Sequence, residues 1–264
     1  MCRLFGLYSN TLVDVYFSFF ESPSGGLVEL SHSNPDGWGI AWFSESGWKL
    51  YKEPMPLYSS NRAKDIIQKV RGRIIVSHVR NASVGGRKKE NTHPWLYRGW
   101  VFAHNGTIDR EELLKLLSSE YSMDLEGDTD SEVFFHLIIQ EVEGVGNPVK
   151  GIINAIKRIT NSGVWFKSLN FIASDSKKLY ALRYVNTNQD YYTLFYVERP
   201  REGLKLRRLS RETQQLIEMK LVRGEKAIII ASEPMSDEPY WRLIPNKQLV
   251  IVDENLNVER VDIG

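Results

Sequence analysis

The chain has 264 residues, of which 42% are hydrophobic and 25% are charged, as expected of a globular protein with one large domain or two small ones. The net charge of +1 gives no reason to expect binding to nucleic acid or to an anionic membrane. The single cysteine excludes an intramolecular disulfide and a zinc site built on several thiolates. The apolar run at residues 15–20 is too short to span a bilayer, and no signal peptide pattern is present, so we expect a cytoplasmic protein.

The N-terminal quarter is expected to hold a strand, a partly helical segment and a hairpin. The apolar segment Leu4–Tyr8 predicts a strand that begins almost at the N-terminus. Residues 13–30 look helical in part. The loop at residues 32–37 is dense in turn-forming residues, and it leads into a hairpin whose strands are residues 38–43 and 48–51.

The second quarter is expected to contain two strands separated by a long loop. A helix capped by Asn61 should run to about residue 71. Residues 73–80, with the sequence RIIVSHVR, predict a strong strand. Residues 81–96 are rich in glycine, asparagine and charge and predict a loop, after which residues 100–104 predict the next strand.

The rest of the chain passes from helices to strands. Helices are expected at residues 109–117, at 129–143, where TDSE has the form of a capping box, and at 149–159. Strand-like segments follow at residues 169–174, 179–184, 191–197, 227–231, 249–252 and 258–261. Residues 185–225 include a charged run and predict a solvated insertion or an edge hairpin. This order predicts an α+β protein with mostly antiparallel sheets and no linker.

Cys2 is a candidate nucleophile because of its position. A lone cysteine is more often a small buried hydrophobic residue. Removal of Met1, however, would give Cys2 a free α-amine, whose pKa of about 7.7 to 8.0 is far closer to neutrality than that of a lysine. This amine could accept the proton of the thiol, whose ordinary pKa is about 8.5. One residue would then supply both the nucleophile and the base.

The sequence His104-Asn105-Gly106 allows two interpretations. Asn-Gly is a strong hairpin-turn dipeptide, but a helical pattern follows it here instead of a return strand. The other interpretation is an oxyanion hole, in which the Asn105 amide and the Gly106 backbone N–H stabilise a developing negative charge. The sequence alone leaves both interpretations open.

Arg80 and Asp130 are candidates for holding a substrate. An arginine at the end of a strand commonly forms a surface ion pair, and an aspartate in the first turn of a helix is favoured by the helix dipole alone. A guanidinium can also grip a carboxylate through two hydrogen bonds. Together the two residues would recognise the α-carboxylate and the α-amine of a glutamine or γ-glutamyl group. The five histidines lack the spacing of metal ligands, so we expect no metal and no cofactor.

These segments occur in an order that resembles a known family. The segments MCRLFG, DGWGIAW, SHVRNASVGG, ENTHPW, FAHNGTI and GDTDSEVFFHLI are similar to those of class II glutamine amidotransferases, above all to the stand-alone, single-domain members. The likeness extends motif by motif from Cys2 to Glu143 and more weakly through NFIASD and ASEPMSDEPYW. It implies the N-terminal-nucleophile hydrolase fold, a four-layer αββα sandwich, and a single domain at residues 2–264 after removal of Met1.

The resemblance also implies roles for single residues. Cys2 matches the nucleophile, its α-amine the base, and Asn105 with Gly106 the oxyanion hole. The positions that match substrate-binding residues are Arg80 for the α-carboxylate, Asp130 for the α-amine, His93 for the glutamine pocket, and Ser83, where many members have threonine. Asn81 and Val84 lie where synthase-linked members commonly carry Trp and His, which indicates a different pocket rim.

The implied reaction is cleavage of the side-chain amide of glutamine, or of a γ-glutamyl compound, through a thioester on Cys2. Because no synthase sequence follows the motifs, one alternative is a γ-glutamyl peptide or conjugate hydrolase that delivers no ammonia to an acceptor. A second alternative is a glutaminase subunit that donates ammonia to a synthase partner. A third is a binding module that has kept the pocket and lost the reaction. In the enzymatic readings the partner is a small-molecule substrate, with no nucleic acid or membrane.

Overall fold

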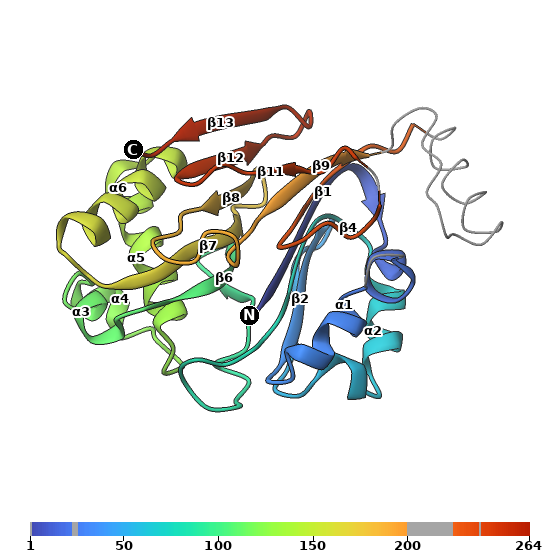
Figure 1. Cartoon of the computed structure of the whole chain (residues 1–264), viewed down its shortest axis with the longest axis horizontal. Coiled ribbons are helices and arrows are strands. Elements are labelled where there is room, and N and C mark those ends of the chain that lie inside the picture. The colour runs from blue at the N-terminus through green and yellow to red at the C-terminus, as the bar shows by residue number, and fades with distance from the viewer. Residues whose placement is uncertain (1, 23–25, 200–223, 238) are drawn as a thin grey trace.

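Two antiparallel β-sheets lie at the centre of the molecule, with helices on their outer sides (Figure 1). The computed structural model describes residues 2–22, 26–199, 224–237 and 239–264. The prediction of an α+β protein with mostly antiparallel sheets is confirmed. The expected insertion or edge hairpin at residues 185–225 lies mostly outside the described residues.

The first sheet has seven strands in the order β11-β9-β10-β1-β4-β2-β3. Its strands are β1 Arg3–Val13, β2 Trp38–Ser44, β3 Gly47–Glu53, β4 Gly72–Val79, β9 Phe195–Arg199, β10 Ala227–Ala231 and β11 Arg242–Leu243. β1 is the middle strand, and it pairs with β10 on one side and with β4 on the other. Cys2 directly precedes β1, so its position is set by the centre of this sheet.

The second sheet has six strands in the order β13-β12-β8-β7-β6-β5. Its strands are β5 Trp95–Tyr97, β6 Trp100–Ile108, β7 Phe166–Ser174, β8 Leu179–Arg183, β12 Gln248–Val252 and β13 Val258–Asp262. The interpretation of Asn105-Gly106 as a hairpin turn is wrong, because β6 continues through both residues. Asn105 pairs with Asn170 of β7, and Gly106 pairs with Leu169.

The helices lie in two groups. The described α-helices are α1 Leu27–Leu30, α2 Ala63–Lys69, α3 Arg110–Leu114, α4 Ser119–Ser122, α5 Asp130–Val145 and α6 Pro148–Asn161. Figure 1 shows α1 and α2 beside the first sheet and the other four beside the second. In the part of the chain that the structure describes, no helix has the length and apolar character needed to cross a membrane.

The start of α2 differs from the sequence prediction. The helix begins at Ala63, and the residue before it, Arg62, makes no side-chain cap. The prediction of Asn61 as the cap is wrong, because a turn closed by the bond from the Ala63 N–H to the Ser60 carbonyl comes first. Local composition shows where a turn is favoured, but it does not show which residue ends it.

The start of α5 is close to the prediction. Thr129 caps the helix, and its hydroxyl accepts the Glu132 backbone N–H at 3.3 Å. The Glu132 carboxylate accepts the backbone N–H groups of Glu126 and Gly127. Thr129 therefore supplies its half of the predicted capping box, and Glu132 orders the loop that leads to the helix.

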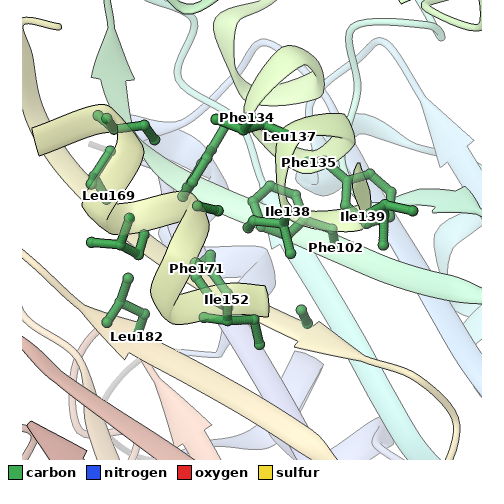
Figure 2. Packing of buried hydrophobic residues seen from close by; sticks show 14 of the residues in the cluster. Phe102, Phe134, Phe135, Leu137, Ile138, Ile139, Ile152, Leu169, Phe171 and Leu182 are labelled. Atoms are coloured by element: carbon green, nitrogen blue, oxygen red, sulfur yellow. The ribbon is translucent and has the colours of Figure 1, made fainter. Parts of the chain in front are cut away.

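Three clusters of buried apolar side chains hold these elements together. One lies between the two sheets and includes Leu4, Val76, Ala103, Ile172 and Val250. A second joins the second sheet to its helices and includes Phe102, Phe134, Phe135, Ile138 and Phe171 (Figure 2). The third joins α1 and α2 to the first sheet and includes Phe5, Leu27, Ile40, Ile67 and Ile75. Full burial of each such side chain stabilises the fold by roughly 1.5 to 3 kcal/mol, so the strands that carry the site residues are held firmly.

Candidate active site

Cys2 is half-buried at the N-terminal end of β1. Its Sγ accepts the backbone N–H of Asn81 at 3.2 Å and lies 3.3 Å from the Asn81 carbonyl oxygen, to which the thiol can donate. Burial raises the pKa of the thiol, whereas the Asn81 bond and the Arg80 charge lower it and the Asp130 charge raises it. Because the effect of burial is the largest, Cys2 needs a base to become a thiolate.

Arg80 directly follows β4, and its side chain is buried. Its guanidinium donates to the carbonyl oxygens of Val84 at 2.7 Å, Gly85 at 3.3 Å and Gly86 at 3.1 Å. These three bonds fold the following loop around the arginine and leave further N–H donors for a ligand. Burial lowers the pKa of Arg80, and the charge of Cys2 raises it. The Cys2 thiol contacts the backbone of Asn81, the residue directly after Arg80.

Asp130 is the first residue of α5 and is also buried. One carboxylate oxygen accepts the Ile108 backbone N–H at 2.7 Å, and the other accepts the Ser131 backbone N–H at 2.9 Å. Asp130 thereby ties the N-terminus of α5 to the end of β6. Its charge acts on the Cys2 thiol together with that of Arg80. The structure thus brings the predicted nucleophile and both charged candidates into one site.

Asn105 and Gly106 both lie in β6. In the part of the chain that the structure describes, Asn105 has a buried donor without a partner, and Gly106 lies against a neighbouring backbone. The Asn105 side chain is buried, and its Nδ2 has no hydrogen-bond partner among the described residues. A buried donor without a partner costs about 1 to 3 kcal/mol, which calls for an explanation. A Cβ atom at Gly106 would lie 1.8 Å from the Ser168 carbonyl oxygen and 2.5 Å from His104 Nε2. Glycine is therefore the residue that fits this close approach.

His104 links these two residues to α5. Its Nε2 lies 3.1 Å from the Ser168 carbonyl oxygen, which can only accept, so this nitrogen carries the proton. Its Nδ1 lies 2.8 Å from Ser131 Oγ. Burial lowers the pKa of His104, although the Asp130 charge opposes this, so the ring is neutral and its Nδ1 can accept a hydrogen bond from the Ser131 hydroxyl, which also lies 3.3 Å from an Asp130 carboxylate oxygen. Ser131 thereby joins the helix start to the strand that carries Asn105.

His93 lies in a buried cluster of rings that contacts β6 at His104. Its Nδ1 accepts the His104 backbone N–H at 3.1 Å. Its ring centroid lies 4.0 Å from that of His78 and 4.1 Å from that of Trp95. Both ring nitrogens of His78 are buried without a partner among the described residues. His93 therefore contacts the site through His104. Within the described ranges, no group of three His, Cys, Asp or Glu residues could hold a metal ion.

Ser83 is exposed in the loop that surrounds Arg80. Its hydroxyl lies 3.2 Å from the Thr107 hydroxyl near the end of β6. Asp36 holds the same loop, because its carboxylate accepts the Ala82 N–H at 2.8 Å and the Arg87 Nε–H at 2.7 Å. Ser83 thus joins the two segments that carry the candidate residues, while Asp36 fixes the loop from the side of β2.

Sequence reasoning missed several residues that position the site. Asp36 was signalled only by its place in the segment DGWGIAW. Ser168 and Asn170 lie on β7, and nothing in the local sequence marks them as neighbours of β6. Ser131 was noted as part of a capping box, but its bond to His104 depends on how α5 packs against the second sheet.

The buried histidines predict loss of stability in mild acid. Burial lowers the pKa of both His78 and His93 well below the ordinary value. Above a pH of about 6.5 these rings are neutral in both folded and unfolded chains. Below it the unfolded chain binds protons that the folded protein does not bind, so the free energy of unfolding falls by about 1.4 kcal/mol per pH unit for each such histidine.

The variant His78→Phe keeps a ring against His93. It removes one of the two groups that bind a proton in the unfolded chain but not in the folded protein. We expect its free energy of unfolding, measured by urea denaturation between pH 7.5 and 5, to fall less steeply with acid than that of the wild type. The control His32→Gln changes an exposed histidine and should keep the wild-type slope. Equal slopes for His78→Phe and the wild type would contradict the prediction.

Comparison with known proteins finds a family match and several similar chains. A family model described as "Glutamine amidotransferases class-II" matches residues 1–260. An uncharacterised protein of Methanocaldococcus jannaschii is 28% identical over 95% of this chain and 69% of its own length. The gamma-glutamyl-hercynylcysteine sulfoxide hydrolase of Mycobacterium tuberculosis is 22% identical over 96% of this chain and 94% of its own. The structure of a glutamine aminotransferase class-II domain protein from Silicibacter pomeroyi has a TM-score of 0.64 at 21% identity and covers 99% of both chains, which shows a shared fold.

Proposed function

The chain belongs to the class II glutamine amidotransferases, and from this premise we propose that it cleaves the side-chain amide of glutamine or of a γ-glutamyl compound, with Cys2 as the nucleophile. The substrate is a small molecule. The proposed catalytic groups are Cys2, its α-amine, Asn105 and Gly106, and the proposed substrate-binding groups are Arg80, Ser83, His93 and Asp130.

The observation that carries the proposal is the buried Nδ2 of Asn105. An amide donor without a partner costs stability, so its presence is explained if the substrate supplies the acceptor. A tetrahedral intermediate formed on Cys2 would offer a negatively charged oxygen at that place. Preorganised donors of this kind stabilise the transition state of acyl transfer because they need no reorganisation during the reaction.

The reaction proceeds in two halves. After Met1 is removed, the α-amine of Cys2 takes the thiol proton, and the thiolate attacks the amide carbon of the substrate. The carbonyl oxygen becomes an oxyanion, which Asn105 Nδ2 and the Gly106 N–H stabilise. The C–N bond then breaks, and the leaving amine takes a proton from the α-ammonium, leaving a thioester on Cys2. Water, deprotonated by the same amine, attacks the thioester. The C–S bond then breaks, the α-ammonium returns its proton to the Cys2 sulfur, and the γ-carboxylic acid leaves and ionises to the carboxylate.

The α-amino-acid end of the substrate would be held by opposite charges. The N–H groups of Arg80 that are not bonded to the loop carbonyls would bind the α-carboxylate, and Asp130 would bind the α-amine. Ser83, at the exposed edge of the same loop, would close over the bound glutamyl group through its contact with Thr107. His93 would act indirectly: it accepts the His104 backbone N–H and so helps to fix the position of Asn105.

We also propose that residues 2–264 form one domain with the αββα sandwich of N-terminal-nucleophile hydrolases. The three apolar clusters support this arrangement, because one lies between the sheets and the other two join each sheet to its own helices. The family match over residues 1–260 leaves no long segment for a second domain within this chain.

A second candidate is hydrolysis of a γ-glutamyl conjugate without transfer of ammonia. The mycobacterial relative named as a gamma-glutamyl-hercynylcysteine sulfoxide hydrolase favours it, because the match covers 96% of this chain and 94% of that protein. The two candidates share the glutamyl group and the nucleophile and differ in the leaving amine. Assays with glutamine and with γ-glutamyl amides, each against the Cys2→Ala variant, distinguish them.

The role of Asp130 is testable through the Michaelis constant. Asp130→Asn keeps an oxygen for the Ile108 N–H but loses the charge that faces the α-amine. We expect KM for glutamine to rise roughly 10- to 100-fold, equivalent to about 1.4 to 2.7 kcal/mol of binding, with a smaller change in kcat. Wild-type protein should also strongly prefer glutamine to its analogue without the α-amine, and the variant should lose this preference.

The matched control for Asp130→Asn is Asp128→Asn. Asp128 lies two residues earlier and pairs with Lys88 at the surface at 3.0 Å, so its replacement should leave KM unchanged. If Asp130→Asn lowers the activity toward glutamine and toward the analogue equally, Asp130 does not bind the α-amine.

A further inference from the structure

We propose that Tyr191 and Tyr192 form a subsite for the leaving amine, and that this subsite favours γ-glutamyl amides whose amine carries an aromatic ring over glutamine. The proposal rests on the proposed function and deepens it, because it specifies the substrate class. The two tyrosines lie in the loop between β8 and β9, a segment to which the reaction described above gives no role.

The register of the first sheet, continued past the ends of β1 and β9, brings Tyr192 to the level of Cys2. Phe5 of β1 pairs with Ala231 of β10, which pairs with Phe195 of β9. Both pairings are antiparallel, so β1 and β9 run in the same direction (Figure 1). Cys2 lies three residues before Phe5, and Tyr192 lies three residues before Phe195. Two strand spacings amount to about 9.6 Å, a gap that a tyrosine side chain can largely bridge.

Hydrogen bonds continue this row beyond the ends of the strands. The Thr193 hydroxyl donates to the Ser232 carbonyl oxygen at 2.7 Å. The Ser232 hydroxyl accepts the Leu4 N–H at 2.9 Å, and the Ser232 N–H donates to the Leu4 carbonyl oxygen at 3.1 Å. The residue after Tyr192 is therefore linked through one serine to the second residue after Cys2.

A second route links Tyr192 to the proposed oxyanion hole. Its carbonyl oxygen accepts Asn170 Nδ2 at 3.2 Å, and Asn170 is the β7 partner of Asn105. The same carbonyl oxygen accepts Arg183 Nε at 3.1 Å, and the buried Arg183 guanidinium also donates to Gln189 O at 2.7 Å. The loop is thus pinned in place beside both Cys2 and Asn105.

The order of the strands decides which part of a substrate would meet the tyrosines. β4 and β10 flank β1 on opposite sides, and β9 lies beyond β10. Arg80 follows β4, so the proposed carboxylate grip lies on one side of Cys2 and Tyr192 on the other. With the glutamyl group held toward Arg80 and the reacting carbon at Sγ, the substituent on the amide nitrogen points toward Tyr192.

The side chains of Tyr191 and Tyr192 are suited to bind an aromatic ring. Tyr191 is 51% exposed, and Tyr192 is half-buried. Their ring centroids lie 5.1 Å apart with the planes at 88°, and Tyr191 also lines a shallow pocket with Asn188, Gln189 and Asp190. Burial raises the pKa of Tyr192, and the charges of Tyr191 and Cys2 raise it further, which agrees with a position near the thiol. Ammonia has no apolar surface that could pack against these rings, whereas an amine that carries an aromatic ring does.

The test compares kcat/KM for glutamine, γ-glutamyl methylamide and γ-glutamyl benzylamide. We expect wild-type protein to favour the benzylamide over the methylamide by about 2- to 13-fold, which converts to the roughly 0.5 to 1.5 kcal/mol that an aromatic pair contributes. Tyr192→Ala should remove most of this preference, since the ring contact is lost. Tyr192→Phe keeps the ring and should keep the preference.

Tyr191→Ala is a second test, made at an exposed side chain whose loss should not disturb folding. It should also reduce the preference for the benzylamide. The subsite is refuted if wild-type protein shows no preference for the benzylamide, or if neither alanine variant reduces it. Cys2-dependent hydrolysis of glutamine and methylamide without any ring preference would refute only the subsite. Absence of Cys2-dependent hydrolysis of all three compounds would refute the proposed function, and the subsite with it.

Discussion

Replacement of Cys2 by alanine is expected to reduce the hydrolysis of glutamine and γ-glutamyl amides roughly 10⁴- to 10⁶-fold, as loss of a covalent nucleophile does in other enzymes. The size of the effect follows from the sequence, because the chain has no other cysteine that could form the thioester. Stability should hardly change, since the Cys2 side chain is half-buried and its recorded hydrogen bonds are to the Asn81 backbone.

The measurement is release of ammonia or amine by Met-processed protein, with the processing confirmed by intact mass. Cys2→Ser is the matched control, because it keeps the shape and a hydroxyl but replaces the thiol by a far weaker nucleophile, and its rate should stay close to that of the alanine variant. Wild-type protein that retains Met1 should be similarly inactive, because its Cys2 nitrogen is then a peptide nitrogen and cannot act as a base. Substantial activity in Cys2→Ala would exclude Cys2 as the nucleophile.

The sequence predicted the elements whose signal is local. Ala227–Ala231 coincides with β10, and the predicted hairpin coincides closely with β2 and β3. β5 and β11 were missed, because strands of three and two residues carry too little apolar pattern to be recognised. The helix expected from Asn61 begins at Ala63, since the favoured cap residue lies within a preceding turn.

Asn105-Gly106 shows why a local preference can mislead. The dipeptide favours a turn, but here β6 is paired with β7 through both residues. Tertiary pairing overrides the dipeptide, and the glycine is needed for a different reason, which is the approach of the Ser168 carbonyl oxygen. A residue type that fits a turn also fits a crowded strand, and only the partner strand distinguishes the two.

The candidate site was predictable in its charged and nucleophilic groups but not in their supports. Cys2, Arg80 and Asp130 are residue types that suit the chemistry. In the structure Cys2 contacts the residue after Arg80, and the loop after Arg80 contacts the end of β6, to which Asp130 is bonded. Ser131 and Ser168, which fix His104, are ordinary polar residues whose roles depend on packing between α5, β6 and β7. The resemblance assigned His93 to the glutamine pocket, whereas the structure records its contact with the site through the His104 backbone.

Asn105→Ala is expected to lower kcat by about 10² to 10³, equivalent to roughly 2.7 to 4 kcal/mol of transition-state stabilisation. KM should change little, because the amide binds the oxyanion of the transition state more strongly than the neutral carbonyl of the substrate. The measurement is steady-state kinetics with glutamine and with a γ-glutamyl amide. Asn161→Ala, at the exposed end of α6, is the matched control and should leave both constants unchanged.

The thermal stability of Asn105→Ala separates a catalytic role from a structural one. A buried asparagine that supports the fold makes hydrogen bonds whose loss lowers the melting temperature. Nδ2 of Asn105 has no such partner in the described part of the chain, so its removal relieves the cost of a buried, unsatisfied donor. The variant should therefore lose most of its activity while its melting temperature stays equal or rises. A fall in melting temperature that parallels the loss of activity would show that Asn105 stabilises the strand rather than the oxyanion.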